Sequence, residues 1–341
     1  MTPSNNSDQT AFSDVLTALF TNRTVPIQDL YSLSDMSDTE TAEFEDRWPT
    51  VDEERRRVIA RHMADLTENN FVVEFSSVFG FMLNDPAPAV RVAALDGLWD
   101  STNTSLIKPI THLLQHDTDA DVRAAAAAAL AHYVLLAEWD QLPRHYSARL
   151  VDTLLNEYDK ENTPIKVKRS VLEAISAANH PRVEEMILTA YHSGDFEAQL
   201  SAVFAMGHTA DARWLPTVLD ELESDEVPMQ TEAARAAGNI GEEKAVPVLA
   251  RLALSEETEV ALTAVHALGQ IGGNIAYKVL TSLIEDPEFE PLHEAATEAI
   301  EELDWLSGNI GANPMLSMSD DEEDDDDYMD LDEDADYLTY H

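Results

Sequence analysis

Seven segments of this chain share one pattern of small and apolar residues at helical spacing and recur at a nearly constant interval. Each segment is indexed here by its last residue, the anchor, and the anchors are Leu98, Leu130, Ile175, Met206, Ala237, Leu268 and Ile300. Successive anchors lie 32, 45, 31, 31, 31 and 32 residues apart. A second amphipathic segment lies between anchors, for example at residues 106–114, 213–222, 245–254 and 275–284. The pattern predicts helical hairpins that must stack, because no single hairpin buries its own apolar face.

The repeat also predicts the fold class. No stretch shows the apolar–polar alternation typical of strands, so we expect an all-α chain. Stacked hairpins of this kind form an α-solenoid, here a superhelix of about seven hairpins. Gly207, Gly238 and Gly269 each directly follow an anchor. Glycine in that position is typical of a helix C-terminus, so we expect helices to end at these glycines.

Composition divides the chain into four parts. Residues 1–10 are rich in Ser, Asn and Thr and are expected to be disordered. Residues 11–68 are expected to form a helical N-terminal cap, with helices at 11–20, 38–47 and 52–66 and a break at Trp48 and Pro49. Residues 69–306 are the solenoid, and residues 307–341 are a disordered acidic tail without periodicity. In the cap, Arg55, Arg56 and Arg57 are expected on an exposed helix face with local ion pairs.

Particular motifs carry a resemblance to a known family. They are Asp85, Ala89, Val90, Arg91, Ala94 and Leu95 in one repeat, Asp117, Asp121, Val122, Arg123 and Leu130 in the next, and Ala264, Ala267, Leu268, Gly269, Gln270, Ile271 and Gly272 later. These motifs resemble the HEAT-like repeats of the phycobilisome-lyase type, over residues 70–306. The resemblance implies an armadillo-like helical solenoid. Its functional implication is broad, because such repeats occur in chromophore lyase subunits, in hydroxylases and in plain scaffolds.

The chain departs from the family pattern at the repeat's arginine. That arginine is clear only at Arg91 and Arg123. The later repeats carry other residues there, namely Lys168, Gln199, Gln230, Ala261 and His293. We therefore expect an internal ladder of aspartate–arginine pairs to be broken toward the C-terminus.

The net charge of −45, from 66 acidic and 21 basic residues, restricts the class of partner. Thirteen acids lie between Asp320 and Asp336, so the rest of the chain carries 21 − (66 − 13) = −32. A field of this sign repels nucleic-acid phosphates and anionic membrane surfaces and attracts basic proteins. The alternative interpretation is that the acidity only keeps the protein soluble or adapts it to salt, and the presence of only six lysines fits adaptation to salt.

Compartment and membrane association follow from two further features. The chain has no cysteine, which excludes disulfides and thiolate chemistry. No apolar run precedes Arg23, so no signal peptide is expected and the protein is interpreted as cytoplasmic. The most apolar stretch, residues 124–137, is expected to be too short to span a bilayer, which needs about 20 apolar residues.

We find no catalytic, cofactor-binding or metal-ligating constellation in the sequence, and we interpret the protein as a non-enzyme. The nearest candidate is His293 with Glu294, because the HEAT-repeat hydroxylase that acts on deoxyhypusine carries His-Glu pairs at this point of several repeats. One pair cannot hold two irons, since a di-iron site needs ligands from several helices. A bilin-lyase type of enzyme or enzyme subunit is the alternative that the family resemblance permits, although no residue argues for it.

The remaining reading is a non-catalytic scaffold or adaptor that binds partner proteins through the solenoid surface. Two candidate binding regions follow. One is the insertion at 131–146, which accounts for the 45-residue spacing and contains Trp139 and Tyr146. A lengthened helix followed by a loop explains the same insertion without any binding role. The other region is the acidic tail, with Asp320, Asp321, Glu322, Glu323, Asp324, Asp325, Asp326 and Asp327, which is expected to attract basic partners.

Overall fold

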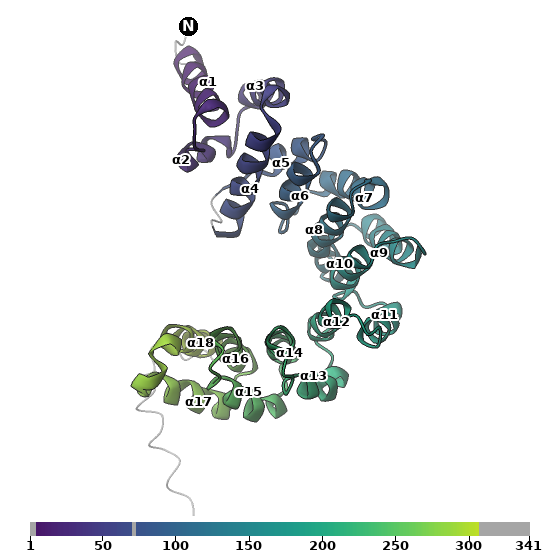
Figure 1. Cartoon of the computed structure of the whole chain (residues 1–341), viewed down its shortest axis with the longest axis vertical. Helices are drawn as coiled ribbons and strands as arrows, with labels where there is room; N and C mark the ends of the chain where they lie inside the picture. The colour runs from purple at the N-terminus through teal and green to yellow at the C-terminus, as the bar shows by residue number, and fades with distance from the viewer. Residues whose placement is uncertain (1–4, 70–72, 307–341) are drawn as a thin grey trace, which may run out of the picture.

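The computed structural model describes residues 5–69 and 73–306, and within them it contains only helices and turns. The helices form two layers that follow one arc, open on the side opposite α7, α9 and α11 (Figure 1). The inner layer consists of α4 (Glu53–Asn69), α6 (Pro88–Asp96), α8 (Ala120–Glu138), α10 (Ile165–Ile175), α12 (Phe196–His208), α14 (Val227–Ile240), α16 (Thr258–Ile271) and α18 (His293–Leu306). The outer layer consists of α5 (Ser76–Met82), α7 (Ile107–His116), α9 (Arg144–Asp159), α11 (Arg182–Tyr191), α13 (Leu215–Glu221), α15 (Val246–Leu252) and α17 (Gly273–Glu285).

Pairing each outer helix with the inner helix that follows it gives seven hairpins, from α5 and α6 to α17 and α18. The predicted α-solenoid of about seven hairpins is therefore confirmed. The anchors explain why the hairpins stack: from Leu98 to Leu268 they are buried, and Ile300 packs against the same core. Neighbouring inner helices contact one another throughout the arc, so one continuous apolar core runs along the solenoid.

The N-terminal cap consists of α1 (Asn5–Thr21), α2 (Ile27–Leu30), α3 (Asp38–Arg47) and α4. Helix α3 has the predicted bounds, because Ser37 and Glu40 form a capping box at its start and a 3-10 turn at Trp48–Thr50 follows its end. Phe44 and Trp48 stack with ring centroids 5.0 Å apart and cover the first hairpin.

Helix α1 differs from the prediction at its start. It begins at Asn5 rather than at residue 11, while residues 1–4 lie outside the described part. The buried residues Phe12, Leu16 and Leu19 fix the helix downstream. Once a helix is nucleated, each further residue adds one hydrogen bond, so a helix can extend from this apolar part into polar sequence.

Helix α8 is the one helix in the described residues that is long and apolar enough, by length and composition, to cross a membrane. It has 19 residues, because Asp119 caps its start by accepting from the backbone N–H groups of Asp121 and Val122. The expectation that this stretch is too short is therefore wrong on length. Half of its apolar window is buried inside the solenoid, where α8 packs against α6, α7 and α10. Packing between repeats accounts for its composition.

The glycine series also has a packing role that the sequence did not predict. Gly207, Gly238 and Gly269 lie in the last turn of α12, α14 and α16, just before these helices end at His208, Ile240 and Ile271. A Cβ on Gly207 would lie 2.5 Å from Cα of Ala236, and the other two glycines meet the next inner helix in the same way. These glycines therefore allow inner helices to approach closely. Gly241 and Gly272 directly follow α14 and α16, with φ of +74° and +67°.

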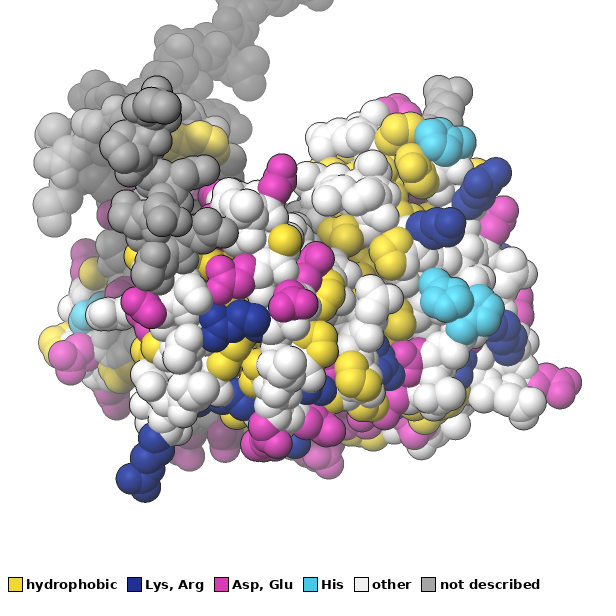
Figure 2. Space-filling model, turned by 90° about the horizontal axis from the view of Figure 1, so that it is seen from above, with side chains coloured by type: hydrophobic (Ala, Val, Ile, Leu, Met, Phe, Trp, Pro, Cys, Tyr) yellow, Lys and Arg dark blue, Asp and Glu magenta, His cyan; other side chains and the backbone are white. Residues whose placement is uncertain are grey.

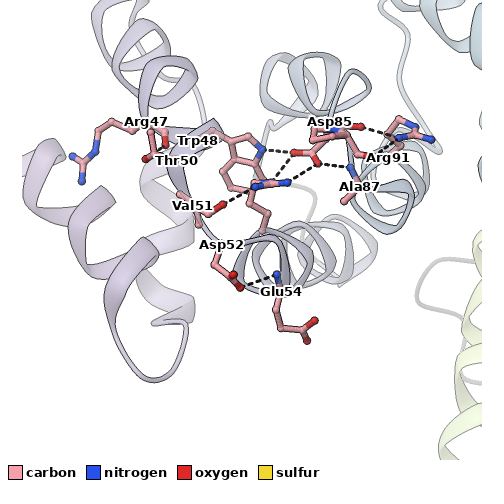
Figure 3. A network of polar contacts seen from close by, with 11 residues as sticks. Arg47, Trp48, Thr50, Val51, Asp52, Glu54, Asp85, Ala87 and Arg91 are labelled. Atoms are coloured by element: carbon pink, nitrogen blue, oxygen red, sulfur yellow. Dashed lines mark hydrogen bonds and ion pairs between the residues drawn. The ribbon is translucent and has the colours of Figure 1, made fainter.

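Three buried or partly buried ion pairs join the N-terminal repeats, namely Arg56 with Asp85, Arg91 with Asp117, and Arg123 with Glu157. Figure 3 shows the contacts that Trp48 and Ala87 make with Asp85. The first pair corrects the expectation that all three cap arginines are exposed: Arg57 is exposed and pairs with Glu54, but Arg56 is only 7% exposed. The carboxylate of Asp85 accepts from Arg56, from Trp48 Nε1 at 2.8 Å and from the backbone N–H of Ala87 at 2.9 Å. It therefore joins the cap to the first repeat.

The ladder of ion pairs ends after these three, where the sequence loses its arginines. In the two repeats that carry glutamine at this position, a weaker contact replaces the ion pair. The Nε2 atoms of Gln199 and Gln230 donate to the carbonyl oxygens of Tyr191 and Leu222 at 3.1 and 3.0 Å. Each accepting carbonyl lies at the end of the preceding outer helix, as does the Leu114 carbonyl that accepts from Arg123. Glutamine thus keeps the bond within the hairpin but forms no ion pair with the neighbouring repeat.

Candidate functional site

In the inner helices from α6 to α16, the residue nine positions before the anchor is exposed. The residues six, five and two positions before the anchor range from exposed to buried, and their types change from repeat to repeat. In the described part of the chain, two hollows on the concave face of the inner layer involve α10. They are called here the concave groove, over α4, α6, α8 and the start of α10, and the polar hollow, over α10, α12, α14 and the start of α16.

The concave groove has a volume of about 800 Å³. Its floor is made of small or branched apolar residues, namely Val58, Pro88, Ala89, Val92, Ala93 and Ala124. Its rim is charged and consists of Glu54, Arg57, Arg61, His62, Asp119, Asp121 and Lys166. The groove exists because the first two repeats place alanine or valine where later repeats carry larger or polar side chains.

The rim charges already pair with one another across exposed surface. Arg57 contacts Glu54 at 2.7 Å, and Lys166 pairs with Asp121. Each of these four side chains is about half exposed or more. Exposed ion pairs of this kind are worth about 0–1 kcal/mol each. Charges on a bound polypeptide can therefore replace them at little cost in free energy.

The polar hollow is smaller, about 330 Å³, and holds partly buried charge. Arg169 Nε donates to Ser201 Oγ at 3.0 Å, and the Ser201 hydroxyl donates to the carboxylate of Glu173. Arg169 also contacts Glu197 at 3.0 Å. On the other side of the hollow, Glu232 pairs with Arg235 one turn along α14.

Burial raises the pKa values of both partly buried carboxyl groups in the polar hollow. For Glu173 the effect of burial exceeds the opposing effects of the Ser201 hydroxyl and the Arg169 charge. For Glu232 burial again dominates, Arg235 opposes it, and the charge of Glu173 raises the pKa of Glu232 further. The two carboxylates therefore repel each other across the hollow.

The sequence-predicted binding residues lie away from both hollows. Trp139 directly follows α8 and is 59% exposed. Tyr146 lies in the first turn of α9 and packs half-buried against the core. The insertion thus lengthens α8, as the structural reading of the spacing predicts, and then leads into α9. Neither aromatic residue lines the concave groove or the polar hollow. The acidic residues 320–327 lie outside the described residues.

The lone His293–Glu294 pair has a structural contact. His293 Nε2 lies 3.0 Å from the carbonyl oxygen of Asp286, a geometry in which the ring nitrogen donates. In the part of the chain that the structure describes, no group of three or more His, Asp or Glu side chains is arranged to hold a metal ion.

Sequence reasoning missed the residues of the concave face. The signal that identifies them is the repeat itself: Ala89, Asp121 and Lys166 are nine residues before their anchors, and Arg169 and Thr231 are six before theirs. On the surface seen in Figure 2, acidic, basic and hydrophobic side chains are interspersed.

Comparison with known proteins identifies the repeat. Residues 78–141 and 215–301 match the family model of HEAT repeats. No curated protein sequence matches this chain. Three solved structures with low sequence identity resemble it, each with a low TM-score. An engineered protein is 19% identical, with 87% of this chain and 89% of that chain covered and a TM-score of 0.37. The Escherichia coli protein YibA is 15% identical, with 83% of this chain and 98% of that chain covered and a TM-score of 0.44. Human deoxyhypusine hydroxylase in complex with glycerol is 16% identical, with 88% of this chain and 98% of that chain covered and a TM-score of 0.31.

Proposed function

We propose that this chain, which carries HEAT repeats, is a non-catalytic scaffold or adaptor that binds a segment of a partner protein on its concave face. The observation that carries the proposal is the concave groove, with its apolar floor and exchangeable charged rim. The small residues of the floor leave room for larger apolar side chains, which the partner supplies.

The charge of the chain supports a basic partner. Without the acids of the tail, the chain still carries −32, and such a field accelerates the encounter with a positively charged protein. The acidic residues of the tail would add to the same attraction. Long-range attraction of this kind is screened by salt, so association with the partner should slow as ionic strength rises.

Capture of partners from the native lysate at low salt, read by mass spectrometry, tests the proposal. The informative variant is Ala89→Trp, which fills the groove from an exposed position on α6. Its matched control is Ala148→Trp, because Ala148 is an exposed alanine on the outer helix α9. We expect Ala89→Trp to lose partners that the unaltered chain and Ala148→Trp both retain. Equal capture by all three proteins would contradict a role for the groove.

The alternative function is an enzyme or enzyme subunit of the bilin-lyase type, which the resemblance to phycobilisome-lyase repeats suggests. A degenerate relative of deoxyhypusine hydroxylase is a weaker version of the same idea. An absorbance spectrum and a metal determination on the purified full chain distinguish these readings. A stoichiometric bilin or metal would favour an enzyme and contradict a purely scaffolding role.

A further inference from the structure

The polar hollow contains more negative than positive charge. Glu173, Glu232 and Glu259 line it, against two bases, Arg169 and Arg235. Both bases are already engaged. Arg235 pairs with Glu232, and Arg169 directs its guanidinium to Glu197 and to the hydroxyl of Ser201.

Glu173 is consequently a partly buried carboxylate without a cation in direct contact among the described residues. Its one side-chain hydrogen bond comes from Ser201, which is itself 2% exposed. Removing a carboxylate from water is costly unless a positive charge or several donors compensate. The structure therefore leaves acceptor capacity on Glu173 that a ligand can use.

A second, independent observation points to a ligand in the same place. Thr231 lines the polar hollow from α14 and is 3% exposed, and its Oγ1 has no hydrogen-bond partner. Buried hydroxyl groups are nearly always hydrogen-bonded in folded proteins. Thr231 sits next to Glu232 in sequence, so an unsatisfied hydroxyl and two carboxylates border one small cavity.

We propose that the polar hollow binds a positively charged side chain of the partner protein. A cation placed there would contact Glu173, reduce the repulsion between Glu173 and Glu232, and bring donors to the wall that contains Thr231. A guanidinium group suits this geometry, because its five N–H donors can serve several acceptors at once. The apolar residues Leu200 and Phe204 then border the methylene part of the side chain.

The proposal rests on the proposed function, since it supplies one anchor of a partner segment that also occupies the concave groove. The two sites meet on α10. Lys166 lines the groove, while Arg169 and Glu173, three and seven residues further along, line the polar hollow. These three residues share one face of the helix. A single extended segment crossing α10 can therefore reach both sites.

Methyl NMR spectroscopy of the full chain tests the inference with N-acetyl-L-arginine methylamide as the probe. The methyl groups of Leu200 and Thr231 report on the polar hollow, and those of Val92 report on the concave groove. We expect the probe to shift the Leu200 and Thr231 signals and to leave Val92 unchanged. The neutral citrulline analogue, which has nearly the same shape, should cause no shift at the same concentration.

Variants add a second measurement. Glu173→Gln should weaken binding of the arginine probe about tenfold, as expected for loss of one charge-assisted hydrogen bond. Glu256→Gln removes an exposed carboxylate outside the hollow and should leave binding unchanged. Equal shifts with citrulline, shifts confined to Val92, or undiminished binding by Glu173→Gln would each overturn the inference. If the arginine probe does not bind but Ala89→Trp still abolishes partner capture, the inference about the polar hollow is wrong and the scaffold proposal stands.

Discussion

Arg56 and Asp85 form a buried ion pair that joins the N-terminal cap to the first repeat, with Nε 2.9 Å and Nη2 3.3 Å from the two carboxylate oxygens. The side chains are 8% and 1% exposed. Trp48 donates to the same carboxylate from the turn that ends α3. Three segments that are distant in the sequence thus depend on one acceptor.

Asp85→Ala is expected to destabilise the cap strongly, because it leaves the Arg56 guanidinium buried without a counter-charge. Breaking a buried pair in this way costs about 3–5 kcal/mol. Urea unfolding followed by tryptophan fluorescence and circular dichroism measures the loss. Glu54→Gln is the matched control, since it breaks only the exposed pair with Arg57 and should change the free energy of unfolding by less than about 1 kcal/mol. A similar, small effect for both variants would contradict the structural role of Asp85.

Gly207→Ala is expected to destabilise the solenoid because α12 and α14 are too close for a methyl group at that position. The new Cβ would lie 2.5 Å from Cα of Ala236. This backbone atom cannot move away without a shift of α14. Overpacking of this kind costs about 1–3 kcal/mol.

The matched control for that substitution is Gly80→Ala in α5. There the new Cβ would come no closer than 3.1 Å to a flexible Leu106 side chain. Replacing a helical glycine with alanine otherwise favours the helix by up to about 1 kcal/mol. The midpoint temperature of thermal unfolding should therefore fall for Gly207→Ala and should rise or stay unchanged for Gly80→Ala. A Gly207→Ala protein as stable as the unaltered chain would show that the helices are not in close contact.

The raised pKa of Glu173 predicts a pH-dependent effect of Glu173→Gln. A carboxyl group whose pKa is higher in the folded chain than its ordinary value of 4.5 binds its proton more tightly when folded. The contribution of that group to stability is complete below pH 4.5 and is lost as the pH rises through the raised pKa. Glu173→Gln should thus increase the free energy of unfolding at pH 7 relative to the unaltered chain. The difference should disappear near about pH 3, where nearly all Glu173 side chains are protonated in both states.

Urea unfolding at the two pH values checks this expectation, with Glu256→Gln as the control for the loss of one acidic residue. A stabilisation by Glu173→Gln that is equal at both pH values would argue against ionisation of a buried carboxyl group. A destabilisation at pH 7 would mean that the Ser201 and Arg169 contacts outweigh the cost of burial.

Trp139 and Tyr146, the two aromatic residues of the insertion, should respond differently to truncation. Trp139→Ala should change the free energy of unfolding by less than about 0.5 kcal/mol, because the indole is 59% exposed. Tyr146→Ala should cost about 1–3 kcal/mol, because the ring packs half-buried against the core. Thermal unfolding measures both. If Trp139→Ala reduces partner capture without loss of stability, the insertion is a binding edge as the sequence suggests; unchanged capture would leave it a structural extension.

The sequence was sufficient to predict the fold because the apolar positions of the repeat are the positions at which neighbouring hairpins pack. The anchors recur at the interval of one hairpin, and local caps such as Ser37 with Glu40 set helix ends without reference to the rest of the chain. The apolar period thus predicted the layers and most inner helices.

What the sequence did not reveal depends on contacts between repeats. Arg55, Arg56 and Arg57 look alike in the sequence, and only the partner at Asp85, 29 residues away, shows which one is buried. Gly207 is recognised from the sequence as a residue near a helix C-terminus, but only its distance to Ala236 shows that it also lets two inner helices pack closely. The candidate site was missed for the same reason. The concave groove is formed by small residues such as Ala89 and Ala124, which carry no chemical signal of their own.

Site-specific photo-crosslinking tests the central claim, that a partner lies on the concave face, most directly. A photoreactive amino acid at Glu54, an exposed rim position, probes the groove, and the same residue at Ala148 probes the outer helix α9. The account predicts crosslinks to a captured partner from position 54, none from position 148, and a decrease at position 54 as salt is raised. Crosslinks from position 148 without any from position 54 would place the partner on the outer layer and contradict the account.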